Sequence, residues 1–95
     1  MLEGRRKAKD KETIYDYVEE LPYTANFFFD PVGTWRYCHG DGKSSTRGRF
    51  HIETMLGNDG LYHVRLLDRD DPVWTTAYES LPTSHQIVGD IKAAF

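Results

Sequence analysis

A segment in the middle of the chain, residues 49–67, predicts a β-hairpin whose strand register can be worked out from the sequence. Two runs rich in β-branched and aromatic residues flank the turn signal Gly57-Asn58-Asp59-Gly60. A three-residue loop of Asn58, Asp59 and Gly60 suits a type I turn followed by a left-handed residue, a conformation that glycine adopts without a steric clash. This loop sets the following residues opposite one another: Leu56 and Tyr62, Thr54 and Val64, Ile52 and Leu66, and Phe50 and Asp68.

The predicted register separates an apolar face of the hairpin from a polar one. The apolar face carries Phe50, Ile52, Leu56, Tyr62, Val64 and Leu66, and the other face, which we expect to meet solvent, carries His51, Glu53, Met55, His63 and Arg65. Glu53 lies directly across from Arg65, and such an opposite-charge pair stabilises a sheet by about 0.2–1 kcal/mol. A two-residue loop would exchange the faces of one strand, so burial of the apolar set favours the three-residue loop.

Turn and helix signals on either side of the hairpin predict the remaining elements. Asp10 is placed to cap a helix over residues 11–21, where Ile14, Tyr17, Val18 and Leu21 form one apolar stripe. Short strands are predicted at Asn26–Phe29, Thr34–His39 and Val73–Tyr78, separated by turns at residues 30–33 and 68–72. Thr83 and Gln86 fit the capping box of a second helix, whose apolar stripe is Ile87, Val88, Ile91, Ala94 and Phe95.

These elements predict a single α+β domain over residues 10–95. It consists of an N-terminal helix, an antiparallel meander of about five strands, as an open sheet or a small barrel, and a C-terminal helix. Residues 1–9 are expected to be a disordered basic leader. The chain is short enough, at 95 residues, for one domain with one modest core.

Charge and cysteine content limit the classes of partner and compartment. The net charge is −3, and residues 1–11 contribute +3 whereas residues 12–95 contribute −6. An acidic body does not provide the broad basic surface that binds nucleic acid. The single Cys38 excludes an internal disulfide and favours a reducing, cytoplasmic compartment. No apolar run approaches the ~20 residues of a membrane span, so no membrane partner is expected.

The polar loop of residues 39–49 is the segment most suited to binding a ligand. It combines three glycines, three hydroxyl side chains and three cations, and this combination can hold a phosphate or a carboxylate. The alternative is a solvated strand connection without a ligand. The candidate binding residues here are Lys43, Ser44, Ser45, Arg47 and Arg49.

Aromatic residues offer a second kind of candidate surface. Phe27, Phe28, Phe29, Trp35, Tyr37 and Trp74 would either be buried on both faces of the sheet beneath the terminal helices or leave an interface patch, and the first arrangement is favoured. Trp35 and Tyr37 share one face of their strand, with Arg36 and Cys38 on the other. Because Trp, Tyr and Arg dominate interface energetics, Trp35 and Tyr37 are candidate anchors for a partner.

Motifs for catalysis and for metal binding are not apparent. Gly42-Lys43-Ser44 has a tyrosine at the position where a phosphate-binding P-loop needs its first glycine, which excludes nucleotide hydrolysis by that motif. The four histidines and Cys38 lack the spacings of zinc sites, and Cys38 is expected to be a small buried side chain. Asp68, Asp70 and Asp71 miss the spacing of a calcium loop. No enzyme activity, cofactor or metal is therefore expected.

The order of several short segments resembles the layout of a known domain family. These segments are Gly33-Thr34-Trp35-Arg36-Tyr37, Gly48-Arg49-Phe50-His51-Ile52, Tyr62-His63-Val64 and Tyr78-Glu79-Ser80-Leu81, before a final helix. They are similar in order to Src-homology phosphotyrosine-binding domains, in which the polar loop after the second strand holds the phosphate. The chain departs from that family at the phosphate-binding arginine, whose position is Cys38 here, and Arg36 lies two residues away. The resemblance is therefore one of layout.

Three functions are consistent with these observations. The first is a small, non-catalytic interaction module, a stoichiometric regulator or inhibitor of the kind that phages and bacteria encode, which binds a protein partner as a monomer or a homodimer. The second is binding of a phosphate-bearing ligand, either nucleic acid or phosphopeptide, through the 39–49 loop. The third is an acidic mimic of nucleic acid, which requires the negative charges to gather on one face.

Overall fold

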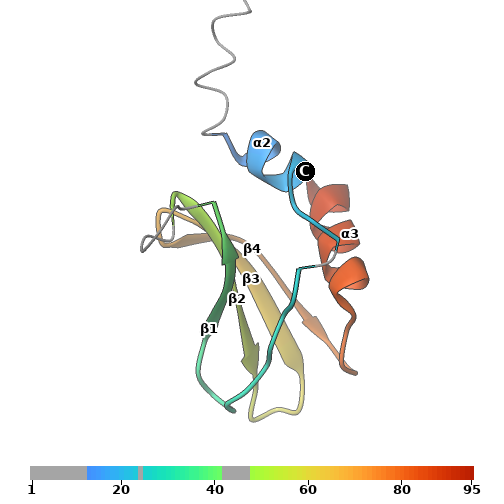
Figure 1. Cartoon of the computed structure of the whole chain (residues 1–95). Helices are drawn as coiled ribbons and strands as arrows, with labels where there is room; N and C mark the ends of the chain where they lie inside the picture. The colour runs from blue at the N-terminus through green and yellow to red at the C-terminus, as the bar shows by residue number, and fades with distance from the viewer. Residues whose placement is uncertain (1–12, 24, 42–47) are drawn as a thin grey trace, which may run out of the picture.

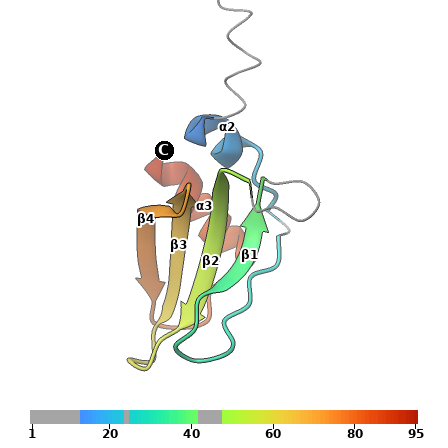
Figure 2. The same ribbon diagram turned by 90° about the vertical axis from the view of Figure 1, so that its left-hand side faces the viewer.

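A computed structural model of the chain describes residues 13–23, 25–41 and 48–95. The described elements follow the order α2 (Ile14–Glu19), β1 (Arg36–Gly40), β2 (Phe50–Leu56), β3 (Tyr62–Asp68), β4 (Asp71–Tyr78) and α3 (Ser84–Ala94). The strands form one antiparallel sheet in the order β1-β2-β3-β4, and both helices lie on the same face of it (Figures 1 and 2). The α+β prediction is confirmed as a four-stranded open sheet. Burial of both faces beneath the helices is not observed.

The β2–β3 hairpin has the predicted register. Glu53 pairs with Arg65, and the four pairs expected on the apolar face are present. The Gly60 N–H donates to the Gly57 carbonyl at 3.0 Å, and Gly60 has φ +82°, which is the left-handed conformation expected at the end of the loop. The Leu61 N–H also donates to the Asp59 carboxylate at 3.0 Å, so the loop is fixed by a side chain as well as by its backbone.

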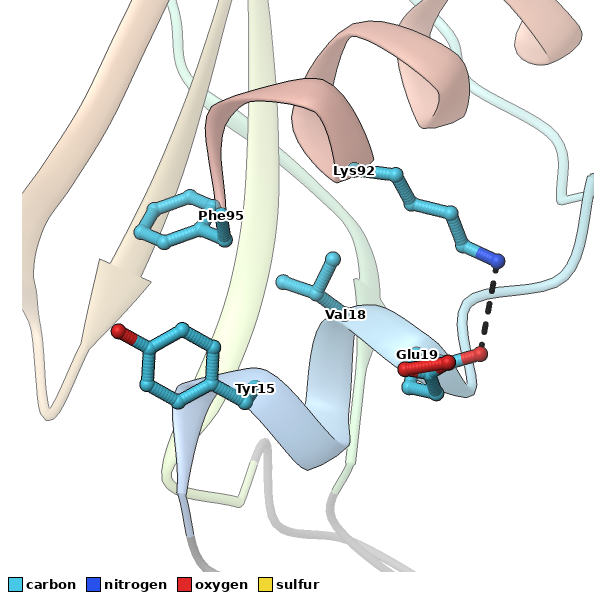
Figure 3. Close-up of a pocket in the computed structure, with 5 residues that line it drawn as sticks. All are labelled: Tyr15, Val18, Glu19, Lys92 and Phe95. Carbon is cyan, nitrogen blue, oxygen red and sulfur yellow. Dashed lines mark hydrogen bonds between the residues drawn. The ribbon is translucent and has the colours of Figure 1, made fainter.

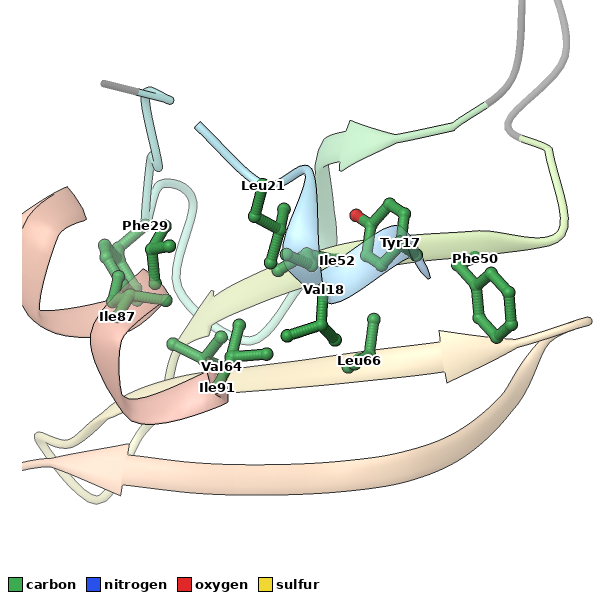
Figure 4. Packing of buried hydrophobic residues seen from close by; sticks show 11 residues of the cluster. Tyr17, Val18, Leu21, Phe29, Phe50, Ile52, Val64, Leu66, Ile87 and Ile91 are labelled. Carbon is green, nitrogen blue, oxygen red and sulfur yellow. The ribbon is translucent and has the colours of Figure 1, made fainter. Parts of the chain in front are cut away.

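The core fills the space between the helix-covered face of the sheet and the two helices (Figure 4). Phe50, Ile52, Val64 and Leu66 from the hairpin are fully buried there. From the helices and from the segment before β1 come Tyr17, Val18, Leu21, Phe29, Ile87, Val88 and Ile91. The predicted apolar face of the hairpin is therefore the floor of the core.

The segment Asn26–Phe29 is not a strand, and the prediction of a fifth strand was wrong. Phe28 meets β1 and β2 through side chains instead of a backbone ladder: its N–H donates to the Cys38 sulfur at 3.5 Å, and its carbonyl accepts a hydrogen bond from the Thr54 hydroxyl. The register of β1 shifts between Tyr37 and His39, and such a bulge turns an edge strand away from regular pairing. Cys38 is half-buried instead of enclosed in the core.

The two strands that border the hairpin begin differently from their predictions. β1 starts at Arg36, because the chain before it makes a turn in which the Gly33 N–H donates to the Leu56 carbonyl at 2.8 Å. β4 starts at Asp71, because Arg69 and Asp70 both have positive φ and close a two-residue hairpin turn. β4 is therefore two residues longer than predicted.

Both helices begin at a threonine cap. The Thr83 hydroxyl accepts from the Gln86 N–H at 3.0 Å, as predicted for α3. The other helix, α2, starts after Thr13 rather than Asp10, because Thr13 is extended and its hydroxyl accepts from the Asp16 N–H. Pro22 disfavours helical geometry at the residue before it, and α2 ends at Glu19.

The last residues of the predicted stripe of α3 are not buried. Ile87, Val88 and Ile91 lie in the core, but Ala94 and Phe95 are exposed. The Tyr78 hydroxyl donates to the Asp90 carboxylate at 2.7 Å and joins β4 to α3. Within the described part of the chain, each helix is too short and too polar to cross a bilayer.

Candidate functional site

The face of the sheet opposite the helices carries a cluster of aromatic and charged side chains. Figure 2 looks toward this side, with the strands in front of α3. We call the cluster the open-face cluster, and it consists of Trp35, Tyr37, His51, Glu53 and Arg65. The strand register explains how it forms, since Tyr37 pairs with Glu53 and Glu53 pairs with Arg65, which places the three side chains in one row across β1, β2 and β3.

Arg65 is held from two sides. Its Nε and Nη2 atoms donate to Oε1 of Glu53 at 3.0 and 2.7 Å, and its guanidinium carbon lies 4.0 Å from the centre of the Trp35 ring. Trp35 is the residue directly before β1. Because Arg65 is on β3, the Trp35 side chain reaches diagonally across β2 to contact it. A guanidinium that is both paired with a carboxylate and stacked on an indole keeps few of its rotamers. The structure therefore presents Trp35 and Arg65 as one rigid unit.

His51 and Glu53 lie beneath this unit and are shielded from solvent. The exposed fractions are 1% for His51 and 6% for Glu53, so the expectation that these residues of the polar face meet solvent was wrong. Nε2 of His51 lies 3.1 Å from Oε2 of Glu53, and the ring of Tyr37 lies 5.8 Å from the His51 ring. The Tyr37 ring and the Arg65 guanidinium are among the groups that contact these two residues.

The electrostatics of Glu53 follow from these contacts. Burial opposes ionisation of the carboxyl group, but hydrogen bonds from Arg65 and His51 outweigh it and hold the pKa of Glu53 below its usual range. The carboxylate is therefore ionised at neutral pH and offers one oxygen to each neighbour. It is the residue that joins the cluster together.

A groove of about 290 Å³ extends from this cluster along β3 and β4. Its lining includes Trp35, His63, Arg65, Pro72, Thr75 and Ala77. His63 is positioned at one side by Asp59, with Nε2 of the imidazole 3.1 Å from a carboxylate oxygen. The Leu61 N–H, and then His63, lower the pKa of Asp59. The groove thus presents mixed apolar and polar surface next to a fixed cation.

A second hollow, of about 210 Å³, lies where α2 meets the end of α3 (Figure 3). Tyr15, Val18, Glu19, Lys92 and Phe95 line it, and the ammonium group of Lys92 donates to the Glu19 carbonyl at 3.5 Å. It contains no convergent set of polar groups comparable to the open-face cluster.

The predicted binding residues divide between two places. Lys43, Ser44, Ser45 and Arg47 lie outside the described residues. Arg49, from the same loop, pairs with Asp68 through Nε at 2.8 Å and Nη2 at 3.2 Å, and its guanidinium lies over the Phe50 ring on the helix-covered side. Trp35 and Tyr37 belong instead to the open face. The structure therefore separates Arg49 from the two aromatic candidates.

The base of the 39–49 loop is fixed on both strands. The Asp41 N–H donates to the Phe50 carbonyl at 3.1 Å, and the Phe50 N–H donates to the Asp41 carboxylate at 3.2 Å. Burial lowers the pKa of His39, at the start of the loop. At Cys38, the position where the resemblance in layout would need a phosphate-binding arginine, the thiol contacts Thr54, and Arg36 lies over the Phe28 ring.

Sequence reasoning identified Trp35 and Tyr37 but not the cluster around them. The Glu53–Arg65 pair was predicted from the hairpin register, and Tyr37 was placed on one face of its own strand. The missing step was the pairing of that face with His51 and Glu53, which depends on how β1 aligns with β2 across the long loop. The feature that could have indicated the cluster is Glu53, which has Tyr37 as its partner on one neighbouring strand and Arg65 on the other.

Comparisons with known proteins assign no relative to this chain: no known family, no curated protein and no solved structure matches it. Among the described residues, no group of three or more His, Cys, Asp or Glu side chains has the arrangement of a metal site.

Proposed function

We propose that the protein is a small, non-catalytic module that binds a protein partner through the helix-free face of its sheet, as a stoichiometric regulator or inhibitor. The observation that carries this proposal is the rigid packing of Trp35 on Arg65, with Glu53 beneath them. α2 and α3 lie on the opposite face (Figures 1 and 2), so neither of these described helices covers the cluster.

The composition of the cluster favours protein binding. Trp, Tyr and Arg are the residues most enriched at the energetic centres of protein interfaces. Tyr37 is 39% exposed and lies next to the buried His51 ring, so a partner can cover it without displacing the core. Because Arg65 and Trp35 are already ordered, binding loses less side-chain entropy than it would with free side chains. The adjoining groove provides a concave surface beside these anchors.

The burial of the titratable groups supports a structural role for them rather than a catalytic one. Glu53 uses its two carboxylate oxygens for Arg65 and His51, and His51 is 1% exposed. A general acid or base must come within hydrogen-bond distance of its substrate, and the burial of His51 and Glu53 opposes such an approach. We therefore infer that His51 and Glu53 make the cluster rigid, and that the partner contacts its outer side chains.

The charges of the described residues favour a protein over a polyanion. Arg65 is neutralised by Glu53 and Arg49 is neutralised by Asp68, so each would have to exchange its partner to hold a phosphate. A surface whose cations are already paired gains little from the release of counterions that drives phosphate binding. We therefore expect the affinity for the partner to depend weakly on salt concentration.

The test compares two exposed tyrosines that lie on different sides of the molecule. Tyr37 borders the cluster, whereas Tyr15 is 66% exposed on α2 and serves as the control. The tagged chain is used to capture its partner from a lysate of its source organism, and the captured protein is identified and purified. Isothermal titration calorimetry then measures the stoichiometry and the affinity for the wild type, Trp35→Ala, Tyr37→Ala and Tyr15→Ala.

We expect a complex of one partner per chain. Tyr37→Ala and Trp35→Ala should each weaken it by about 30-fold or more, as expected for interface anchors worth about 2 kcal/mol. Tyr15→Ala should leave the affinity within about twofold of the wild type. Equal affinities for Tyr37→Ala and the wild type would contradict the proposal. Capture that disappears after nuclease treatment, or an affinity that falls steeply with salt, would favour the phosphate-binding alternative.

A further inference from the structure

The two edges of the sheet are protected to different degrees. β1 has five residues, includes the charged Arg36, and changes register within its length. Phe28 also contacts it through the Cys38 sulfur. Short length, a bulge, a charge and a covering segment are the features by which native proteins prevent unwanted pairing at a strand edge. This edge is therefore closed to a further strand.

The other edge, β4, is protected only at its beginning. Asp71, Pro72 and a register shift opposite Leu66 and Leu67 interrupt the first residues of the strand. The six residues that follow, Val73–Tyr78, carry no charge, whereas β1, β2 and β3 each contain a charged residue. This stretch, VWTTAY, consists of β-branched and aromatic residues apart from one alanine, which is the composition of a segment prone to add a strand.

The outer side of β4 has no backbone partner among the residues that the structure describes. The strand order places β4 last in the sheet, and Figures 1 and 2 show neither helix nor strand beyond it. The described backbone hydrogen bonds outside the regular elements do not involve residues 71–78. An edge of this kind presents N–H and C=O groups that a further strand can pair with.

We propose that a second copy of this chain pairs with β4 in the antiparallel sense, about a two-fold axis at Thr76, and joins the two sheets into one. This register sets Trp74 opposite Tyr78 of the second copy, and Thr75 opposite Ala77. An antiparallel pair of identical strands is self-complementary, which is the requirement for a closed two-fold dimer. The proposal concerns the backbone edge of β4, whose Thr75 and Ala77 side chains line the groove beside the open-face cluster, and it does not depend on that cluster.

The side chains of β4 support this choice of register. Trp74 and Tyr78 both lie on the helix-covered face and are half-buried at the margin of the core. An axis at Thr76 brings these rings together across the interface, and aromatic pairs are among the more stabilising cross-strand pairs. Thr76 then meets its own copy, which is also a favourable pair. Because Tyr78 is hydrogen-bonded to Asp90, its position at the edge is fixed before the second copy arrives.

Sedimentation velocity over micromolar to millimolar concentrations tests the association. The wild type should approach twice its chain mass of 11.0 kDa. Thr75→Lys and Ala77→Glu each place a charge on the exposed side of β4 and should raise the dissociation constant of the dimer about tenfold or more. Thr34→Lys adds the same positive charge as Thr75→Lys, but at an exposed threonine outside the strands, and should leave the dimer unchanged. Circular dichroism and thermal unfolding check that every variant is folded.

A mixture of two variants tests the register itself. In the proposed dimer, position 75 of one copy faces position 77 of the other, so Thr75→Lys and Ala77→Glu mixed in equal amounts should form a mixed dimer with an opposite-charge pair. The mixture should dimerise up to about fivefold more tightly than either variant alone, which is the effect of one cross-strand charge pair. A wild type that stays monomeric throughout, a Thr75→Lys variant that dimerises like the wild type, or a mixture that shows no recovery would each overturn the proposal.

Discussion

Replacing Glu53 by glutamine tests whether the open-face cluster is held together as the structure indicates. The substitution keeps the size of the side chain but removes the charge that accepts from Arg65 at 2.7 and 3.0 Å and meets His51 at 3.1 Å. Hydrogen bonds to charged groups contribute about 1.5–3 kcal/mol each when buried. The Arg65 side chain is 25% exposed and can turn partly to water, so we expect a total loss of about 1–2 kcal/mol at pH 7.

Urea unfolding followed by circular dichroism and tryptophan fluorescence measures this loss. The matched control is Glu79→Gln, because Glu79 is exposed and follows directly after β4, and its substitution should change the free energy of unfolding by less than about 0.5 kcal/mol. In a domain of this size, each kcal/mol of stability that is lost should lower the Tm by about 4–8 °C. A Glu53→Gln variant as stable as the wild type would refute the account of the cluster.

The difference in free energy of unfolding between the wild type and Glu53→Gln should depend on pH. Because the pKa of Glu53 is lowered in the folded state, its contribution is complete above the unfolded pKa of about 4.3 and is lost as the pH falls through the lower folded value. The stability difference between the wild type and Glu53→Gln should therefore be largest near neutral pH and shrink in acid. A difference that grows as the pH falls would contradict this assignment.

Three further substitutions test the local structure by urea unfolding. Gly60→Ala should destabilise the protein by about 1 kcal/mol, because position 60 has φ +82° although the space around it is open. Gly89→Ala lies within α3 with open space beside it and should stabilise the protein by about 0.5–1 kcal/mol, so changes of the same sign at the two glycines would contradict the structure. Thr83→Ala removes the acceptor for the Gln86 N–H and should cost about 0.5–2 kcal/mol. Thr34→Ala is its control, and an equal loss there would argue against the cap.

The elements that were predicted correctly are those set by short-range chemistry. The loop Asn58-Asp59-Gly60 dictated the register of β2 and β3, because glycine at its third position accepts the left-handed conformation. The cap of α3 was likewise visible as Thr83 followed by Gln86. In both cases a few consecutive residues determine the local conformation, and the tertiary structure is compatible with it.

The predictions that were wrong depend on contacts between distant segments. Asn26–Phe29 has the composition of a strand, but side chains of Cys38 and Thr54 satisfy the Phe28 backbone in place of a ladder. His51 and Glu53 belong to a polar face by pattern, yet they are buried, with the Tyr37 ring next to His51 and Arg65 bound to Glu53. Alternation along one strand shows which face of the sheet a side chain lies on. Whether that side chain is buried depends on residues from other segments of the chain.

The location of the partner on the molecule can be measured directly by photo-cross-linking. A benzoylphenylalanine is introduced in place of Tyr37, beside the open-face cluster, or in place of Tyr15, on α2, and each protein is irradiated in complex with the purified partner. We expect a cross-linked product of one chain and one partner from position 37 and little from position 15. Efficient cross-linking from position 15 with none from position 37 would place the partner on the helix side and contradict the central claim.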